Sequence, residues 1–205
     1  CGLSIVSVDV PSGLIADCQM TGADLPGPVV RADMTVTMGL PKTGMVLAPG
    51  IEYVGRLVVA DIGFPQDLME DSRRTLHLTV AGEVAAMLPP RPRGGHKGTF
   101  GSVLVVAGSR GMTGAAVLTG HGAQRSGSGL VYVACPERLE ATIERLLIEP
   151  LQVAARSDDG WVFDLRSLDD IQAASEKVSA VALGPGLGQR ESTRALVAAL
   201  CRGIE

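Results

Sequence analysis

The sequence of 205 residues predicts an α/β protein with two halves joined by a polar stretch. In its second half, continuous apolar segments alternate with helical segments across glycine-rich turns, which is typical of a parallel sheet buried on both faces. The first half contains shorter β-branched segments bounded by glycine or proline, as strands commonly are. A charged and proline-rich stretch separates the two halves and predicts an interdomain connection.

The first domain is assigned to residues 1–66, and its elements follow from local composition. Segments rich in Val, Thr or Ile predict strands at 3–10, 34–38 and 57–62. The glycine- and proline-rich segment 40–50 predicts a loop rather than a helix. Residues 67–95 form the connection, with a short helix at 80–88 that ends before Pro89, because proline cannot continue a helix.

The second domain is assigned to residues 96–205. Strands are predicted at 102–107, 130–134 and 178–183, and helices at 115–125, 137–147 and 191–200. The first of these strands, the glycine-rich turn 108–114, the helix and the second strand together form a βαβ unit. This half therefore predicts a doubly wound α/β fold.

Composition excludes several classes of protein. With 46% hydrophobic residues the chain can offset the entropy of ordering its backbone, so it is not disordered. A net charge of −4 and 3% aromatic residues argue against a nucleic-acid partner. No apolar stretch reaches the ~18 residues that a membrane span needs. The four cysteines are scattered, which favours a cytoplasmic setting in which they are small buried hydrophobes.

The two ends of the sequence favour an internal piece of a longer protein. The chain begins at Cys1 and enters an apolar segment at once, without a basic leader. It stops at Glu205 without a recognisable finish. We expect a fragment on these grounds.

Ligands of open α/β sheets bind beyond the carboxyl ends of the strands, and three loops carry unusual residues there. The first is Asp9-Val10-Pro11-Ser12-Gly13, where a carboxylate on a stiff turn could bind substrate, or could simply cap backbone N–H groups. The others are glycine-rich, at 108–114 and 184–188, where glycine permits either close approach of a ligand or tight packing of the turn. Lys42 could face the first loop, but we expect a solvated loop lysine.

In this order, the motifs resemble the bifunctional NAD(P)H-hydrate repair enzymes. Residues 8–13, 30–37, 41–44 and 58–63 resemble the C-terminal part of the family's Rossmann-like epimerase domain. Residues 96–101, 108–116, 125–130 and 184–188 resemble the N-terminal part of its ribokinase-like dehydratase domain. Two unrelated sets of motifs in the right order are more specific than either set alone.

The resemblance implies an epimerase that interconverts the R and S forms of hydrated NADH and NADPH. It also implies a dehydratase that uses ADP or ATP to remove water from the S form, with its main nucleotide-binding loops outside this chain. Asp9 would contact the hydrated nucleotide and take part in proton transfer, and Ser12 would help bind a potassium ion. Ala115 or Ala116, together with Gly186, would contact the hydrate. The oligomeric state stays open, a homo-oligomer included.

Departures from the family pattern lead to a further expectation. The family's upstream Asn-Asn-Gly-Gly-Asp-Gly loop and its later segment with the catalytic Asp are absent, so we expect this chain alone to be inactive in both reactions. The spacer 17–31 is longer than usual, with Cys18 where Thr is common. Two other functions remain open: a ribokinase-like kinase of a small vitamin-precursor alcohol, or a non-catalytic α/β module that binds a partner protein.

Overall fold

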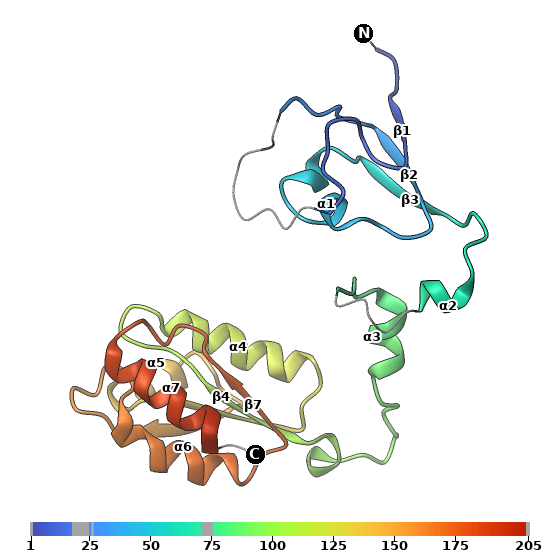
Figure 1. The fold of residues 1–205 in the computed structure, drawn as a ribbon. Coiled ribbons are helices and arrows are strands. Elements are labelled where there is room, and N and C mark those ends of the chain that lie inside the picture. Colours follow the sequence, from blue (N-terminus) through green and yellow to red (C-terminus); the bar gives the residue numbers. More distant parts are fainter. Residues whose placement is uncertain (1, 18–24, 26, 71–75, 204–205) are drawn as a thin grey trace. The chain divides into compact units, whose positions relative to one another are not determined.

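The computed structural model describes residues 2–17, 25, 27–70 and 76–203. The chain divides into two compact units, Cys1–Met87 and Leu88–Glu205 (Figure 1). The division falls within the stretch 67–95 that the sequence predicts as a connection. Cys18 and the rest of the segment 18–24 lie outside the described residues.

The first unit contains a sheet of three parallel strands in the order β1-β2-β3 (Figure 1). The strands are β1 (Val6–Val8), β2 (Met34–Met38) and β3 (Arg56–Ala60). All three predicted strands are confirmed, although the first is shorter than the predicted 3–10. It pairs with β2 only from Val6, opposite Met34, to Val8, opposite Val36.

The predicted loop 40–50 is wrong in part, because it contains α1 (Thr43–Val46) and the start of the 3-10 turn η1 (Gly50–Glu52). Tertiary packing stabilises α1, since the side chain of Met45 is fully buried and the N–H of Gly44 donates to the carbonyl of Ala16 at 2.7 Å. A Cβ at Gly44 would lie 1.9 Å from the carbonyl oxygen of Ile15. Glycine is a poor helix former, but it is required at position 44 because the two backbones are in close contact there.

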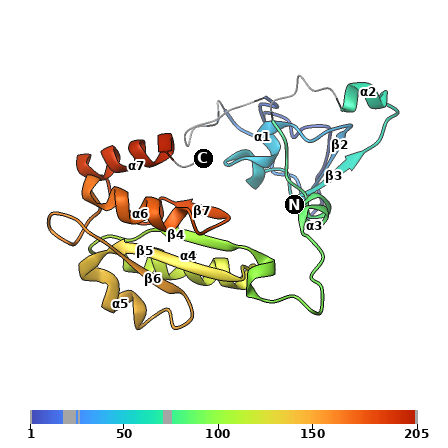
Figure 2. The same ribbon diagram turned by 90° about the horizontal axis from the view of Figure 1, so that it is seen from below.

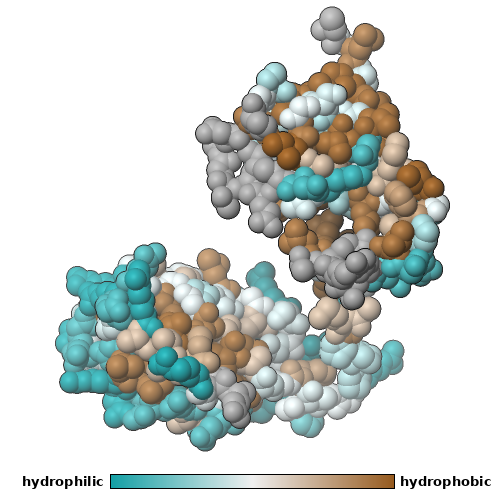
Figure 3. Space-filling model, viewed as in Figure 1, coloured by the Kyte–Doolittle hydropathy of each residue, from teal (hydrophilic) through white to brown (hydrophobic). Residues whose placement is uncertain are grey.

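Two short helices follow the first sheet: α2 (Gln66–Met69) and α3 (Ala81–Met87). The second confirms the helix predicted at 80–88. Neither helix has a buried residue. Figure 3 shows apolar side chains gathered on the surface of the first unit. Several apolar residues of this unit are exposed, among them Val8, at 69%, and Val59.

The second unit has a four-stranded parallel sheet in the order β6-β5-β4-β7. The strands are β4 (Ser102–Val106), β5 (Leu130–Pro136), β6 (Leu151–Ala155) and β7 (Ala180–Leu183). The helices and 3-10 turns are η2 (Lys97–Phe100), α4 (Thr113–Arg125), η3 (Glu137–Leu139), α5 (Glu140–Glu144), η4 (Leu165–Ser167), α6 (Leu168–Ser175) and α7 (Glu191–Gly203). The predicted α/β class is confirmed, and the sheets of both units are parallel.

Helices cover both faces of the second sheet, as Figure 2 shows. One core contains Leu104 and Val106 of β4 together with side chains of α6 and α7. The other contains Val105 with side chains of α4 and α5. Alternate residues of β4 thus enter opposite cores, which explains why this strand is continuously apolar. Within the described residues, no helix is both long enough and apolar enough to span a bilayer.

The strand order creates a switch point in the second sheet. From β4 the chain adds β5 and β6 on one side, and then crosses to place β7 on the other side of β4. The connections that leave β4 and β7 therefore diverge to opposite faces of the sheet. Open α/β sheets bind ligands in the crevice at such a point, beyond the carboxyl ends of the two strands.

Candidate functional site

Asp9 leaves the carboxyl end of β1 in an unusual backbone conformation. Its φ is +64°, and it is the one non-glycine residue with a positive φ among the described residues. The N–H of Asp9 still pairs with the carbonyl of Val36 at 2.8 Å, and the next N–H, of Val10, turns back to Val8 at 2.9 Å. This sharp turn places the carboxylate at the ends of β1 and β2. Left-handed conformations cost an L-residue free energy, and Asp tolerates them better than most.

The Oδ1 atom of Asp9 accepts three hydrogen bonds. They come from the main-chain N–H of Met38 at 3.0 Å, the hydroxyl of Thr37 at 3.3 Å and the ammonium of Lys42. The Nζ of Lys42 also donates to Thr37 Oγ1 at 2.8 Å and to the carbonyl of Met38 at 3.1 Å. The expectation that Lys42 is a solvated loop residue is therefore wrong, because its three acceptors all belong to this site.

These contacts keep Asp9 ionised. The hydrogen bond from Lys42, followed by that from the amide of Met38, holds the pKa of Asp9 below its ordinary value. The side chain remains 42% exposed, and its second oxygen, Oδ2, has no hydrogen-bond donor among the described residues. One oxygen is thus fixed by the protein, while the other can accept a hydrogen bond from a ligand.

Ser12 lies three residues further along the same turn and is exposed. Its carbonyl accepts from the N–H of Val30 at 2.9 Å, which holds the turn against the chain before β2. A hydroxyl oxygen suits a hard cation such as potassium, but a hard cation takes several oxygen ligands. Among the residues that the structure describes, no group of three or more His, Cys, Asp or Glu side chains could hold a metal ion. By donor type, the hydroxyl of Ser12 could provide at most one of those oxygen ligands.

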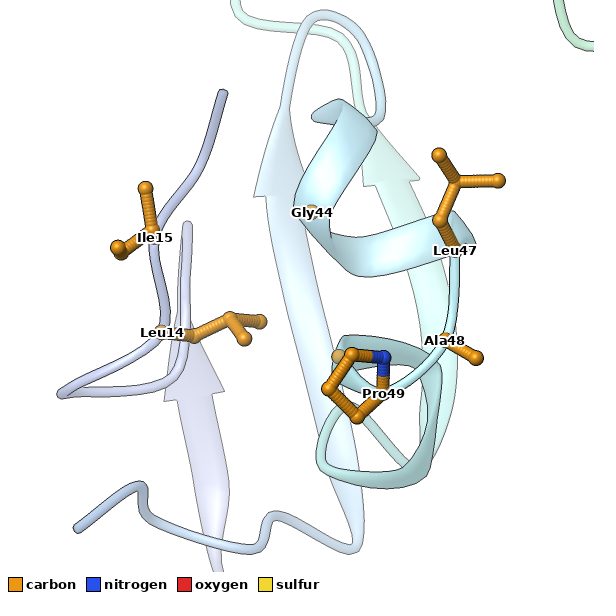
Figure 4. Close-up of a pocket in the computed structure, with 7 residues that line it drawn as sticks. Leu14, Ile15, Gly44, Leu47, Ala48 and Pro49 are labelled. Atoms are coloured by element: carbon orange, nitrogen blue, oxygen red, sulfur yellow. The ribbon is translucent and has the colours of Figure 1, made fainter. Parts of the chain in front are cut away.

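Beside this turn lies a small apolar pocket, lined by Leu14, Ile15, Gly44 and residues 47–50 (Figure 4). Its cavity volume is about 10 Å³, which is room for about one water molecule. Leu14 extends toward the α1 segment in Figure 4. At this size the pocket is too small to be a substrate site.

The second candidate site lies at the switch point, where the two glycine-rich loops meet. The N–H of Gly108 donates to the carbonyl of Pro185 at 2.9 Å, and the buried hydroxyl of Ser109 donates to the carbonyl of Gly186 at 2.7 Å. The loops predicted separately at 108–114 and 184–188 are therefore joined. Together they present main-chain groups at the carboxyl ends of β4 and β7.

Gly186 packs directly against the first turn of α4. Its φ is +68°, and a Cβ there would lie 2.7 Å from Cβ of Ala115 and 2.9 Å from the carbonyl oxygen of Met112. The structure brings Ala115 next to Gly186 with part of its surface exposed. In contrast, the side chain of Ala116 is fully buried beneath Gly108 in the core. Of the two alanines, only Ala115 presents its side chain on this surface.

The two described cysteines differ in their environment. Cys135, at the end of β5, is fully buried, and burial raises the pKa of its thiol to about 12. Cys201 is exposed on α7, so the expectation that all cysteines are buried is wrong there. Neither forms a disulfide bond.

Known proteins resemble this chain in both halves. The family model described as NAD(P)H-hydrate dehydratase matches residues 103–203, and the one described as YjeF-related protein N-terminus matches residues 2–44. The bifunctional NAD(P)H-hydrate repair enzyme of Moorella thermoacetica is 38% identical over 98% of this chain, and that of Thermofilum pendens is 38% identical over 100%. The chain spans 37% of the length of each of these two relatives.

A solved structure also aligns with part of the chain. It is the ADP/ATP-dependent NAD(P)H-hydrate dehydratase from Bacillus subtilis, co-crystallised with ATP and Mg²⁺. The alignment has 35% sequence identity and a TM-score of 0.43, and covers 57% of this chain and 39% of the other. From the two family matches and the relatives that align across both units, we conclude that the chain belongs to the NAD(P)H-hydrate repair enzyme family and spans the junction of its two domains.

Proposed function

We propose that the protein containing this chain repairs hydrated NADH and NADPH. Its first unit takes part in interconversion of the R and S forms, and its second unit in the ADP- or ATP-dependent removal of water from the S form. Support comes from relatives of that name aligned across both units. The single structural observation that carries the proposal is the carboxylate of Asp9, ionised and fixed at the end of a parallel strand with one oxygen available.

Asp9 is assigned contact with the hydrated nicotinamide nucleotide in the first site. An ionised carboxylate accepts hydrogen bonds from hydroxyl and amide groups, and a hydrate presents both. Its lowered pKa makes Asp9 a weak base, so it accepts a proton only briefly within a transfer step. Binding and orientation of the reacting hydroxyl are therefore its main contribution, and proton transfer is the second role proposed for it.

Lys42 and Ser12 complete the part of this site that the chain supplies. The ammonium of Lys42 positions Asp9 and offsets its charge, so that the carboxylate keeps one orientation. We assign Ser12 as one oxygen ligand of a potassium ion. When bound, that ion supplies positive charge near the substrate.

The second site binds the hydrate through main-chain groups of Gly186 and the exposed surface of Ala115. Glycine at the crossing of the two loops lets a flat ring approach the backbone closely. Ala116 contributes only through its main chain, because its side chain is buried. ADP or ATP is the proposed second substrate. We place the reaction in the cytoplasm, consistent with thiols that are free at Cys135 and Cys201.

The proposal is tested in the full-length protein, expressed from its complete reading frame. Separate assays follow the conversion of purified R-NADHX to the S form by chromatography, and the recovery of NADH absorbance from S-NADHX with ADP or ATP. Asp9→Asn removes the negative charge and tolerates the left-handed backbone. We expect it to lower the epimerisation rate by about 100-fold, and to leave dehydration within about twofold of wild type.

Asp67→Asn is the matched control, since it makes the same change at an exposed position of α2. It should leave both rates unchanged. The proposal is wrong if the wild-type protein shows neither reaction. The assignment of Asp9 is wrong if Asp9→Asn epimerises as fast as the control variant does.

A further inference from the structure

Three loops at the carboxyl edge of the second sheet are joined by main-chain hydrogen bonds. The N–H of Arg110, after β4, donates to the carbonyl of Trp161, after β6, at 3.0 Å. The N–H of Arg138, after β5, donates to the carbonyl of Gly160 at 3.0 Å. A Cβ at Gly160 would lie 2.7 Å from Cγ of Arg138, so the loops also touch through the arginine stem. The positions of the two arginines relative to the tryptophan are therefore fixed by the backbone.

Both arginines lie over the ring of Trp161. The guanidinium carbons of Arg110 and Arg138 are 5.2 Å and 5.7 Å from the ring centroid, within the range of a cation–π interaction. Both side chains are exposed, whereas the tryptophan is partly buried. A guanidinium that stacks through its face keeps its N–H groups at the edge, where they can bind carboxylate or phosphate.

The positive charge of this pair is not neutralised within the described residues. Neither arginine has a carboxylate within ion-pair distance, and the acidic residues of the neighbouring loop have other partners. Asp159 accepts from the N–H of Trp161 at 2.8 Å through one oxygen, and from Arg190 at 2.8 Å through the other. Asp158 pairs with Arg166 at 2.8 Å. Two guanidinium groups thus remain available for an anion.

Arg110 lies on a loop of the second candidate site. Arg110 directly follows Ser109, whose hydroxyl binds the carbonyl of Gly186 in the second candidate site. Ser109 and Arg110 therefore belong to the loop that follows β4 at the switch point. We propose that Arg110 and Arg138, held over Trp161, bind the diphosphate group of the hydrated dinucleotide. This inference rests on the proposed function for the identity of its ligand, whereas the binding of an anion is inferred from the two guanidinium groups over Trp161, which are unpaired within the described residues.

Trp161 provides a direct probe, because it is the only tryptophan of the 205 residues. Its emission is followed while the chain is titrated with inorganic pyrophosphate and, separately, with NAD⁺, with uncharged adenosine as the ligand control. We expect a saturable change with the two phosphate ligands, which weakens as salt is added. Arg110→Met and Arg138→Met keep the stem and remove the charge, and each should raise Kd by about tenfold, as expected for loss of one charge-assisted hydrogen bond.

Arg125→Met is the matched control variant, at an exposed position at the far end of α4. It should raise Kd by less than about twofold. Circular dichroism checks that each variant is folded. We expect all three to fold, because the three arginine side chains are exposed. The diphosphate site is refuted if pyrophosphate does not bind, or if the two site variants bind it no more weakly than the control.

Kinetics in the protein with its whole reading frame distinguish the two sources of diphosphate. Arg110→Met and Arg138→Met should raise KM for S-NADHX by about tenfold, without changing KM for ADP or ATP. A rise confined to KM for ADP or ATP would overturn the assignment to the dinucleotide. Pyrophosphate binding with no dehydration in any variant would refute the proposed function and the dinucleotide as ligand, while the diphosphate site itself would stand.

Discussion

Asp9 and Gly186 have nearly the same positive φ angle for different reasons. Their φ angles are +64° and +68°, and each lies just after a strand of a parallel sheet. At Gly186 a Cβ would overlap Ala115, so the position excludes any side chain. At Asp9 the side chain is present and bound by Lys42, Thr37 and Met38. In the first site a strained backbone positions a charged side chain, whereas in the second site there is room only for a residue without a side chain.

This difference indicates how each loop can tolerate change. In the first site the interactions are electrostatic and partly exposed, so solvent screens them and each contributes little to stability. In the second site the contacts are close packed, and an added atom has nowhere to move. Substitutions at Gly186 should therefore affect stability far more than substitutions that alter charge around Asp9.

The largest effect is expected from Gly186→Val. A branched side chain with a positive φ is strained, and its Cβ would overlap Ala115 and the carbonyl of Met112. We expect the free energy of unfolding of the second unit to fall by about 3 kcal/mol, measured by urea denaturation. Gly122→Val in α4 is the control, because a Cβ at that position meets no atom within 4 Å. Equal losses in the two variants would contradict the packing argument.

A smaller effect separates two substitutions of Asp9. Asparagine tolerates the left-handed region and valine does not, while both lose the charge. Asp9→Val should therefore be about 1–2 kcal/mol less stable than Asp9→Asn in the unfolding of the first unit. If the two variants unfold at the same urea concentration, the backbone at this position is not constrained as the structure indicates.

The smallest effect concerns the pH dependence of the ion pair. Lys42 lowers the pKa of Asp9 in the folded state relative to the unfolded state, so the pair stabilises the fold above about pH 4. That contribution is lost as the pH falls through the lowered pKa. Lys42→Met should cost about 0.5 kcal/mol at neutral pH, allowing for the exposure of the carboxylate.

Urea unfolding of wild type and Lys42→Met at about pH 7 and about pH 3 checks this sign. The difference in free energy of unfolding between the two proteins should become smaller in acid, because Asp9 is then closer to neutral in both. Lys97→Met, at an exposed position of the other unit, should show no such narrowing. A gap that widens in acid would mean that Lys42 acts through packing rather than through the carboxylate.

The sequence by itself determined the α/β class and most strands. A continuous apolar segment, such as that of β4, needs a sheet covered on both faces, and this pattern can be recognised in a short stretch of sequence. It also marked the turns at Asp9 and Gly186, since glycine, proline and a strand-end carboxylate stand out in any sequence. The strand β6 and the helix α6 were missed, because the segment Leu151–Ala155 is short, carries Gln152 and has little distinctive pattern.

Only the tertiary structure decided which side chains meet. Lys42 and Asp9 are 33 residues apart, and parallel pairing of β1 with β2 brings them together. Similarly, Arg110 and Arg138 reach Trp161 because β4, β5 and β6 end at the same edge of one sheet. Ala115 and Ala116 are neighbours in sequence, but the rotation of the helix exposes one and buries the other. Local patterns indicate which face of an element is apolar, whereas contacts between distant residues follow from strand order and register, which no short stretch of sequence specifies.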